Sequence, residues 1–153
     1  MRHLERLLDR GKRNGSHFAL LSIDLDGFKP VNDRLGHAAG DRLLETIGER
    51  LGDSVRAGDM AARMGGDEFL LILREEQTLA DDLLLDLARR VESAIAQPVN
   101  VGRESVTVHA SIGIATFPEH GSDAMSLLQR ADEAMYRAKR EHRGGSALAG
   151  RTD

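Results

Sequence analysis

The sequence contains no cysteine among its 153 residues, which excludes disulfide cross-links, thiolate zinc sites and cysteine nucleophiles. Aromatic residues make up only 3% of the chain, so the hydrophobic core must be built mainly from aliphatic side chains. The longest apolar run, residues 18–25, is interrupted by Ser22 and Asp24 and is far shorter than the roughly 20 residues of a membrane-spanning helix. We therefore expect no membrane segment in this fragment.

The residues that are present indicate a folded, soluble protein, with 41% hydrophobic and 30% charged residues. With 21 basic and 25 acidic residues the formal net charge is -4, which argues against a non-specific nucleic-acid binder. This balance is compatible with a small anionic ligand held by local charges. The lack of cysteine and of an apolar secretory signal over residues 1–10 is compatible with a cytoplasmic location.

The hydrophobic spacing changes between the strand period and the helix period several times along the chain. It predicts strands at 18–23, 60–64, 69–73 and 106–115, and helices at 1–10, 41–51, 79–95 and from Ser122 or Asp123 to 140. This order predicts an α+β fold: a mostly antiparallel, ferredoxin-like sheet that is covered by helices and has one additional helix. We expect one domain over residues 1–145 and a flexible tail over residues 146–153.

Two acidic pairs are candidates for metal binding. Asp24 and Asp26 end the first predicted strand and share one of its sides, and Asp67 and Glu68 follow two glycines at the tip of a predicted hairpin. If the hairpin lies beside the first strand, carboxylates from both elements and the phosphates of a nucleotide would suit Mg²⁺. Alternatively, the first pair lies at a hydrated strand end and the second in an ordinary solvated turn.

Other polar residues allow both a binding and a structural interpretation. Asn32 and Asp41 suit the edge of a guanine base, although helix capping explains either one equally well. Lys139 and Arg143 are four residues apart on the last predicted helix and could hold phosphates, or could be a solvated basic helix end. His37 is interpreted as structural, because no nucleophile is placed to use it.

Taken together, these motifs resemble the GGDEF-domain family of diguanylate cyclases, and the match covers nearly the whole chain. Their order and spacing make a chance match implausible, although a single Gly-Gly-Asp-Glu-Phe would be weak evidence. The matching segments are Asp-Leu-Asp-Gly-Phe-Lys at 24–29, Asn32-Asp33, Gly36-His37, Gly40-Asp41, Arg-Met-Gly-Gly-Asp-Glu-Phe at 63–69, Ser-Ile-Gly-Ile-Ala at 111–115 and Ala-Asp-Glu-Ala-Met-Tyr-Arg-Ala-Lys at 131–139.

The resemblance implies a fold of the cyclase palm type and an enzyme that condenses two GTP molecules into cyclic di-GMP with release of pyrophosphate. It implies that Asp24, Asp67 and the backbone carbonyl of Leu25 bind Mg²⁺ or Mn²⁺. Glu68 would help to position the metal or the attacking hydroxyl, and Lys29 completes the implied catalytic set. No histidine general base is needed, because a metal ion lowers the pKa of the attacking hydroxyl.

The resemblance also implies the nucleotide contacts. Asn32 and Asp41 would read guanine. The triphosphate would be bound by Lys29, Lys139 and Arg143, together with backbone amides around Gly27 and Phe28.

Regulation follows from the same resemblance. One domain carries one GTP, so two domains must face each other, and we expect a homodimer that is weak in isolation. Arg56 and Asp59 stand at the family's usual distance before the hairpin for an inhibitory cyclic di-GMP site. Arg90 is the candidate for its second arginine, with Arg89 as the alternative in the helix register.

Three departures from the family pattern stand out. The usual opening Asp-x-Leu-Thr-x-Leu-x-Asn-Arg segment is missing, so we expect a fragment of a longer protein with fused sensor or other signalling domains. His142-Arg143-Gly144 replaces the usual Gly-Arg-Asn, and Gly27 occupies a position where aromatic residues are also common. The alternative function is a non-catalytic module that binds GTP or cyclic di-GMP, and the intact Asp67 and Glu68 favour catalysis. A third possibility, an interaction domain, predicts no metal-dependent GTP affinity.

Overall fold

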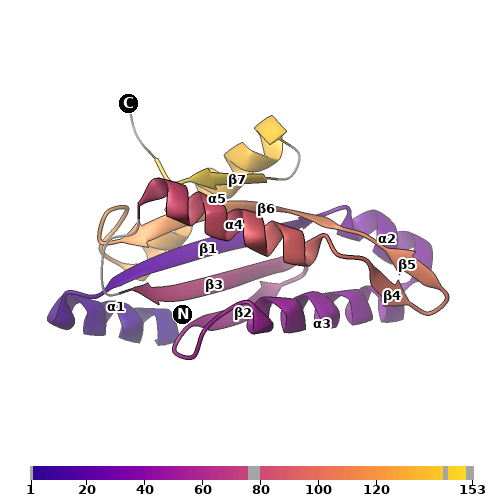
Figure 1. Ribbon diagram of the computed structural model, residues 1–153, viewed down its shortest axis with the longest axis horizontal. Coiled ribbons are helices and arrows are strands. Elements are labelled where there is room, and N and C mark those ends of the chain that lie inside the picture. Colours follow the sequence, from indigo (N-terminus) through magenta and orange to yellow (C-terminus); the bar gives the residue numbers. More distant parts are fainter. Residues whose placement is uncertain (1, 76–79, 143–144, 151–153) are drawn as a thin grey trace.

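The computed structural model describes residues 2–75, 80–142 and 145–150, and Figure 1 shows an elongated molecule whose long axis follows its strands. Within these ranges, every helix is too short or too polar to cross a membrane. The elements in chain order are α1 (Arg2–Asn14), β1 (His17–Asp26), α2 (Phe28–Leu35), α3 (His37–Asp53), β2 (Met60–Gly65), β3 (Glu68–Glu75), α4 (Asp81–Ile95), β4 (Val99–Val101), β5 (Glu104–Val106), β6 (His109–Phe117), α5 (Ala124–His142) and β7 (Gly145–Leu148).

The main sheet has five strands in the order β2-β3-β1-β6-β7, and β4 pairs with β5 in a separate hairpin. The first four strands are antiparallel to their neighbours, whereas β7 runs parallel to β6. The path β1–α3–β2–β3–α4–β6 with this spatial order is a ferredoxin-like arrangement. The predicted α+β fold with a mostly antiparallel sheet is therefore confirmed, and α5 is the predicted additional helix.

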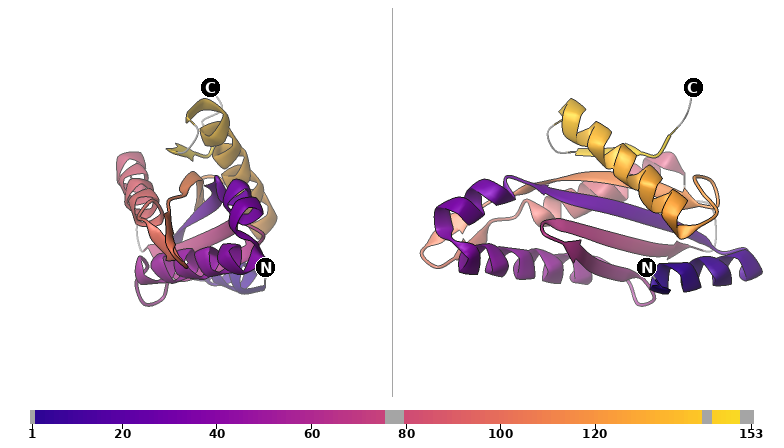
Figure 2. Two further views of the ribbon diagram at one scale, coloured as in Figure 1. Left: turned by 90° about the vertical axis from the view of Figure 1, so that its right-hand side faces the viewer. Right: turned by 180° about the vertical axis from the view of Figure 1, so that it is seen from behind.

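Helices cover both faces of the sheet because successive strand residues point to opposite sides. On one face, Leu21 and Ile23 of β1 belong to a buried cluster with α3 and α4. On the other face, Phe18 and Leu20 belong to a cluster with α1 and α5. The left view of Figure 2 shows α4 and α5 on opposite sides of the strands.

The face of β1 below α5 changes character along the strand. Its first side chains, Phe18 and Leu20, are 3% and 1% exposed. The next three positions on this face are Ser22, Asp24 and Asp26, and the strand remains regular through all of them. One end of this face therefore contributes to the core, while the other presents carboxylates, as the period-two spacing predicted.

Helix α5 lies close against β6 because Gly113 has no side chain. A Cβ at Gly113 would lie 1.9 Å from the carbonyl oxygen of Ala131 and 2.3 Å from the backbone nitrogen of Met135, both on α5. Gly113 is also the cross-strand partner of Ser22. This contact holds α5 over β1 and sets the height of its later residues above the acidic end of the strand.

The structure corrects several predicted boundaries. Helix α2 was not predicted, because none of its residues is buried and it therefore lacks a strong apolar stripe. Helix α3 begins at His37 rather than at residue 41. Gly36, which precedes it, has a φ of 92° and separates α3 from α2. The strand predicted at 106–115 is divided between β5 and β6, and the β4–β5 hairpin was missed.

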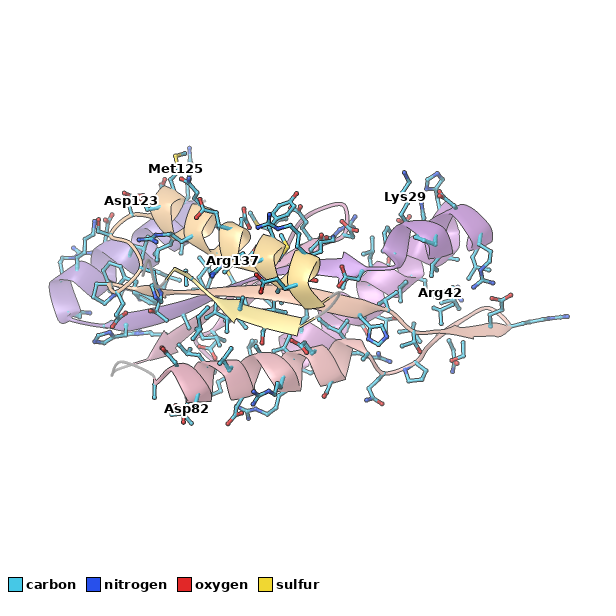
Figure 3. All side chains as sticks on the ribbon, turned by 90° about the horizontal axis from the view of Figure 1, so that it is seen from above. Lys29, Arg42, Asp82, Asp123, Met125 and Arg137 are labelled. Carbon is cyan, nitrogen blue, oxygen red and sulfur yellow. The ribbon has the colours of Figure 1, made fainter. Side chains whose placement is uncertain are left out.

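Residues 146–149, at the start of the segment expected to be a flexible tail, are paired with the main sheet. Residues 145–148 form β7, and the backbone nitrogen of Ala149 donates to the carbonyl oxygen of Ile114 at 2.6 Å. The guanidinium of Arg137, labelled on α5 in Figure 3, donates to the carbonyl of Leu148. Backbone pairing at an open sheet edge orders this segment, although its composition gives little signal.

Candidate active site

Two acidic stretches that are far apart in the sequence meet at one end of the sheet. Asp24 on β1 lies opposite Glu68 on β3, and the backbone nitrogen of Leu25 donates to the carbonyl oxygen of Asp67 at 3.1 Å. Because the N–H and C=O of a strand residue point to the same side, the carbonyl of Leu25 also faces the hairpin turn. The predicted convergence of the two acidic pairs is therefore confirmed.

Glycines place Asp67 at the tip of the β2–β3 hairpin. Gly65 and Gly66 have φ angles of 140° and 53°, which residues with a side chain rarely adopt. The strand register shifts between Arg63 and Gly65, and the Arg63 Nε donates to the carbonyl of Gly66 at 3.0 Å. This local structure turns the chain so that Asp67 faces β1.

Within the acidic cluster, the surroundings of Asp67 and Glu68 favour the neutral form of each carboxyl group. Burial raises the pKa of Asp67, and the charge of Asp24 and a hydrogen bond between the two carboxyl groups raise it further. Burial also raises the pKa of Glu68, followed by the charges of Asp24, Asp132 and Asp67. A positive ion placed among these groups would relieve the repulsion between them.

Lys139 of α5 supplies one such positive charge. Its ammonium group forms an ion pair with the Asp24 carboxylate and lies 3.5 Å from Oδ1 of Asp26. Burial by itself would lower the pKa of Lys139, but the hydrogen bonds and charges of the two aspartates outweigh it and the pKa is raised. Lys139 is therefore charged and partly neutralises the site.

The donor set fits a divalent cation that is bound in part by its substrate. Among the residues that the structure describes, no group of three or more histidine or acidic side chains is arranged to hold a metal by itself. Asp24, Asp67 and the Leu25 carbonyl supply oxygen donors, which suit Mg²⁺ or Mn²⁺. Mg²⁺ typically takes one or two protein carboxylates and fills its remaining positions with water and phosphate oxygens.

A cavity of about 420 Å³ adjoins the acidic cluster. It is lined by Asp67, by Lys139 and by the start of α2, where Gly27 has a φ of 85° and precedes the first helical turn. The N-terminus of a helix favours negative charge, because its free amides and dipole point outwards. Figure 3 shows Lys29 projecting from α2 at the opposite end of the molecule from Met125. Lys29 and Phe28 also line the cavity, whereas Arg143 lies outside the described residues.

The two predicted guanine-reading residues flank Gly40. A Cβ at Gly40 would lie 2.2 Å from Oδ1 of Asn32, so the Asn32 side chain rests on the bare backbone there. The Nδ2 of Asn32 lies 3.3 Å from Nδ1 of His37. Asp41 follows Gly40 directly and is exposed. These contacts place the Asn32 side chain against Gly40, the residue that precedes Asp41, and beside His37.

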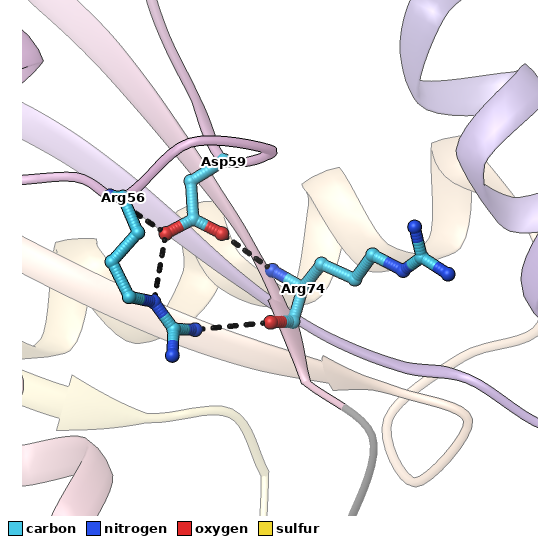
Figure 4. Close-up of polar contacts among 3 residues, drawn as sticks. All are labelled: Arg56, Asp59 and Arg74. Atoms are coloured by element: carbon cyan, nitrogen blue, oxygen red, sulfur yellow. Dashed lines mark hydrogen bonds and ion pairs between the residues drawn. The ribbon is translucent and has the colours of Figure 1, made fainter.

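The residues of the predicted inhibitory site form a separate polar network, shown in Figure 4. One carboxylate oxygen of Asp59 accepts from the backbone nitrogen of Arg56 at 3.1 Å, and the other accepts from the backbone nitrogen of Arg74 at 3.0 Å. The Arg56 guanidinium donates to the carbonyl of Arg74 at 3.1 Å. Arg74 lies six residues from Glu68 along β3, a separation of about 20 Å.

Arg56, Asp59, Arg89 and Arg90 line a cavity of about 800 Å³ beside α4. Arg89 donates to Asp86 at 2.6 Å, one turn earlier on the helix. Within the described part of the chain, Arg90 forms no ion pair with an acidic side chain. The structure therefore places the candidate arginines around one cavity that is separate from the acidic cluster.

Sequence reasoning missed two contacts around the acidic cluster. Ser22 donates to the carboxylate of Asp132 on α5, and Ser111 on β6 donates to Asp26 at 2.8 Å. The partners in these contacts are 110 and 85 residues apart, so no local spacing connects them. Only the strand register and the position of α5 could have indicated these pairs.

Comparison with known proteins identifies the family of the chain. The family model described as "Diguanylate cyclase, GGDEF domain" matches residues 1–145. The chain is 44% identical over 142 residues to the bifunctional diguanylate cyclase/cyclic di-GMP phosphodiesterase MucR of Pseudomonas aeruginosa, covering 93% of this chain and 20% of MucR. It is 42% identical over 147 residues to the diguanylate cyclase TpbB of the same species, covering 95% of this chain and 33% of TpbB. The chain thus spans between a fifth and a third of these relatives.

Solved structures show the same fold. The crystal structure of the GGDEF domain of TpbB has a TM-score of 0.89 and 39% identity, covering 97% of this chain and 92% of that one. The GGDEF domain of DgcB from Caulobacter crescentus, in complex with c-di-GMP, has a TM-score of 0.79 and 25% identity, with coverages of 97% and 85%. The sequence and structural matches together show that the chain belongs to the GGDEF-domain family of diguanylate cyclases.

Proposed function

We propose that this domain catalyses the metal-dependent condensation of two GTP molecules into cyclic di-GMP. The observation that supports this activity best is the meeting of Asp24 and Asp67 beside Lys139 and a cavity at the start of α2. Relatives named diguanylate cyclase support the same reaction. We include a cytoplasmic location, where GTP is available, in this proposal.

The reaction requires alignment and charge compensation. The ribose 3′-hydroxyl of one GTP attacks the α-phosphorus of the other, so that one phosphodiester bond forms and one pyrophosphate leaves. A second attack closes the ring and releases a second pyrophosphate. Mg²⁺ or Mn²⁺, held by Asp24, Asp67 and the Leu25 carbonyl, would stabilise charge on the phosphoryl oxygens and lower the pKa of the attacking hydroxyl.

The remaining residues bind and orient the nucleotide. Asn32 and Asp41 contact the guanine edge, which sets the direction in which the ribose and phosphates enter the cavity. Lys29, Lys139 and the amides at Gly27 and Phe28 bind the triphosphate. Glu68 lies opposite Asp24 and helps to position the metal ion or the attacking hydroxyl, while Arg143 adds a further phosphate contact.

Assembly and regulation are part of the same proposal. One domain supplies one nucleotide site, so two domains must face each other for each product molecule. The relatives are much longer than this chain, which supports fused signalling domains as the source of control. Cyclic di-GMP binds as an inhibitor in the cavity of Arg56, Asp59 and Arg90. The crystal structure of the DgcB GGDEF domain in complex with c-di-GMP supports this part of the proposal.

Removal of the Asp67 carboxylate tests the catalytic proposal. The concentrated domain is incubated with GTP and Mg²⁺ or Mn²⁺, and cyclic di-GMP is measured by chromatography. Asp67→Asn should lower the rate at least about a hundredfold, because metal stabilisation of the transition state is worth several kcal/mol. The melting temperature should not fall, because the environment of Asp67 already disfavours its charge.

Asp82→Asn, which changes an exposed carboxylate at the start of α4, is the matched control and should keep the parent rate. Product formation by Asp67→Asn at the parent rate would refute the metal assignment. Metal-dependent GTP binding without product, even at high domain concentration, would instead identify a non-catalytic receptor.

A further inference from the structure

Both carboxylate oxygens of Asp26 have a partner in the structure, although Asp26 is not one of the proposed metal ligands. Its Oδ2 accepts from the Ser111 hydroxyl at 2.8 Å, and its Oδ1 lies 3.5 Å from Nζ of Lys139. The Ser111 side chain is fully buried on β6, between β1 and β7. A hydroxyl held in a rigid strand therefore fixes the carboxylate, and the carboxylate faces the lysine.

Lys139 and a divalent cation compete for the same partner. The ammonium group is paired with Asp24, and Asp24 is also the proposed metal ligand. A metal ion on Asp24 would repel the ammonium and take its acceptor. Because a lysine side chain is long and flexible, it would then swing towards water unless a second group held it.

We propose that the Ser111–Asp26 pair positions Lys139 at the triphosphate cavity when Asp24 binds the metal ion. This inference rests on the proposed function. Asp26 and Lys139 both line the cavity, so an ammonium group that remains on Asp26 stays beside the phosphates. With three N–H donors, Lys139 can bind Asp26 and still donate to a phosphate oxygen. Asp26 is thus a positioning residue that acts through Lys139.

The substitution Asp26→Asn separates the two contacts of Asp26. Its amide oxygen can still accept from Ser111, while the negative charge that attracts Lys139 is lost. Ser111→Ala provides a second route, because it removes the hydroxyl and leaves the Asp26 charge. Lys139→Gln removes the ammonium group through which Asp26→Asn and Ser111→Ala should both affect nucleotide binding. Thermal unfolding of each variant verifies that it is folded.

The experiment is a calorimetric titration with GMP and with the α,β-methylene analogue of GTP, which cannot release pyrophosphate, both in the presence of Mg²⁺. We expect Asp26→Asn to weaken binding of the analogue about tenfold and that of GMP less than twofold. Ser111→Ala should act in the same direction with a smaller factor. In the Lys139→Gln background, Asp26→Asn should change the affinity for the analogue less than twofold.

The alternative role of Asp26 is a purely structural ion pair between β1 and α5. An equal loss of affinity for both nucleotides, or an undiminished effect of Asp26→Asn in the Lys139→Gln background, would overturn the positioning role. Unchanged binding in Asp26→Asn would overturn it as well. If the parent protein itself binds the analogue no better than GMP, both this inference and the proposed function are wrong.

Discussion

Asp24 illustrates how a single residue can serve two states of a site. A carboxylate that is 14% exposed needs a positive partner, since desolvation disfavours an isolated charge. Lys139 supplies that partner in the structure. In the proposed reaction a divalent cation would take its place, because the carboxyl group of Asp67 faces the same space. The site would then exchange one positive charge for another rather than create an unpaired acid.

The contact between Gly40 and Asn32 leads to a prediction about base recognition. In Gly40→Ala, the new Cβ would lie 2.2 Å from Oδ1 of Asn32, so this flexible side chain must move away from its position against residue 40. The helix should persist, because alanine is a better helix former than glycine by about 1 kcal/mol. We expect the free energy of binding of the α,β-methylene analogue of GTP to weaken by about 1–3 kcal/mol, roughly 5- to 150-fold in affinity, in a calorimetric titration.

The matched control is Gly52→Ala on the same helix, where an added Cβ meets no atom within 4 Å. This variant should bind the analogue as the parent does. If Gly40→Ala also binds like the parent at an unchanged melting temperature, Asn32 is not a guanine reader in the position described.

At the residue level, the sequence predicted the acidic groups but not the contacts that hold them. Asp24 and Asp67 were identifiable because carboxylates at a strand end and after two glycines stand out locally. The role of Asp26 was not, because its partner Ser111 comes from β6 and its partner Lys139 from α5. Such contacts depend on tertiary register, which no local pattern encodes.

Among the elements, β1 and α5 were predicted from their apolar periodicity, whereas α2 and β7 were missed. Strand β1 and helix α5 place many side chains in the core, so their periodicity is strong. Helix α2 has no buried residue, and every described position of β7 is only partly buried. Both are defined by backbone geometry and neighbouring elements, so side-chain patterns gave no signal for them.

The cavity between α4 and the end of β3 supports a prediction about product binding. Arg56 is engaged with Asp59 and Arg74, and Arg89 with Asp86, which leaves Arg90 as the helix residue best able to bind a phosphate. We expect Arg90→Ala to weaken cyclic di-GMP binding roughly 10- to 100-fold in a calorimetric titration, because a charged hydrogen bond contributes about 1.5–3 kcal/mol.

Arg89→Ala provides the comparison on the same helix and should change the affinity less than threefold. A larger loss in Arg89→Ala than in Arg90→Ala would reverse the assignment of the second arginine. Parent-like binding by both variants would show that the product does not use this side of α4.

At the scale of the whole molecule, the two proposed sites occupy different parts of one rigid sheet. The acidic cluster lies where β3 begins, and the arginine cavity lies near its other end, about 20 Å away. Cyclic di-GMP in the arginine cavity therefore cannot compete directly for the metal ligands. Inhibition from the proposed product site would therefore act on how two domains approach each other, or on the elements that join the two sites.

The proposed requirement for two facing domains predicts how the rate depends on concentration. If separate domains associate weakly, the rate per domain should rise in proportion to domain concentration, so that a tenfold dilution lowers it about tenfold until association saturates. Two copies joined by a flexible linker reach an effective concentration of roughly millimolar, and their specific rate should not change on dilution. Cyclic di-GMP production measured over a dilution series of both forms tests this. A constant specific rate for the unlinked domain, at concentrations where sedimentation shows a monomer, would mean that one domain suffices for catalysis.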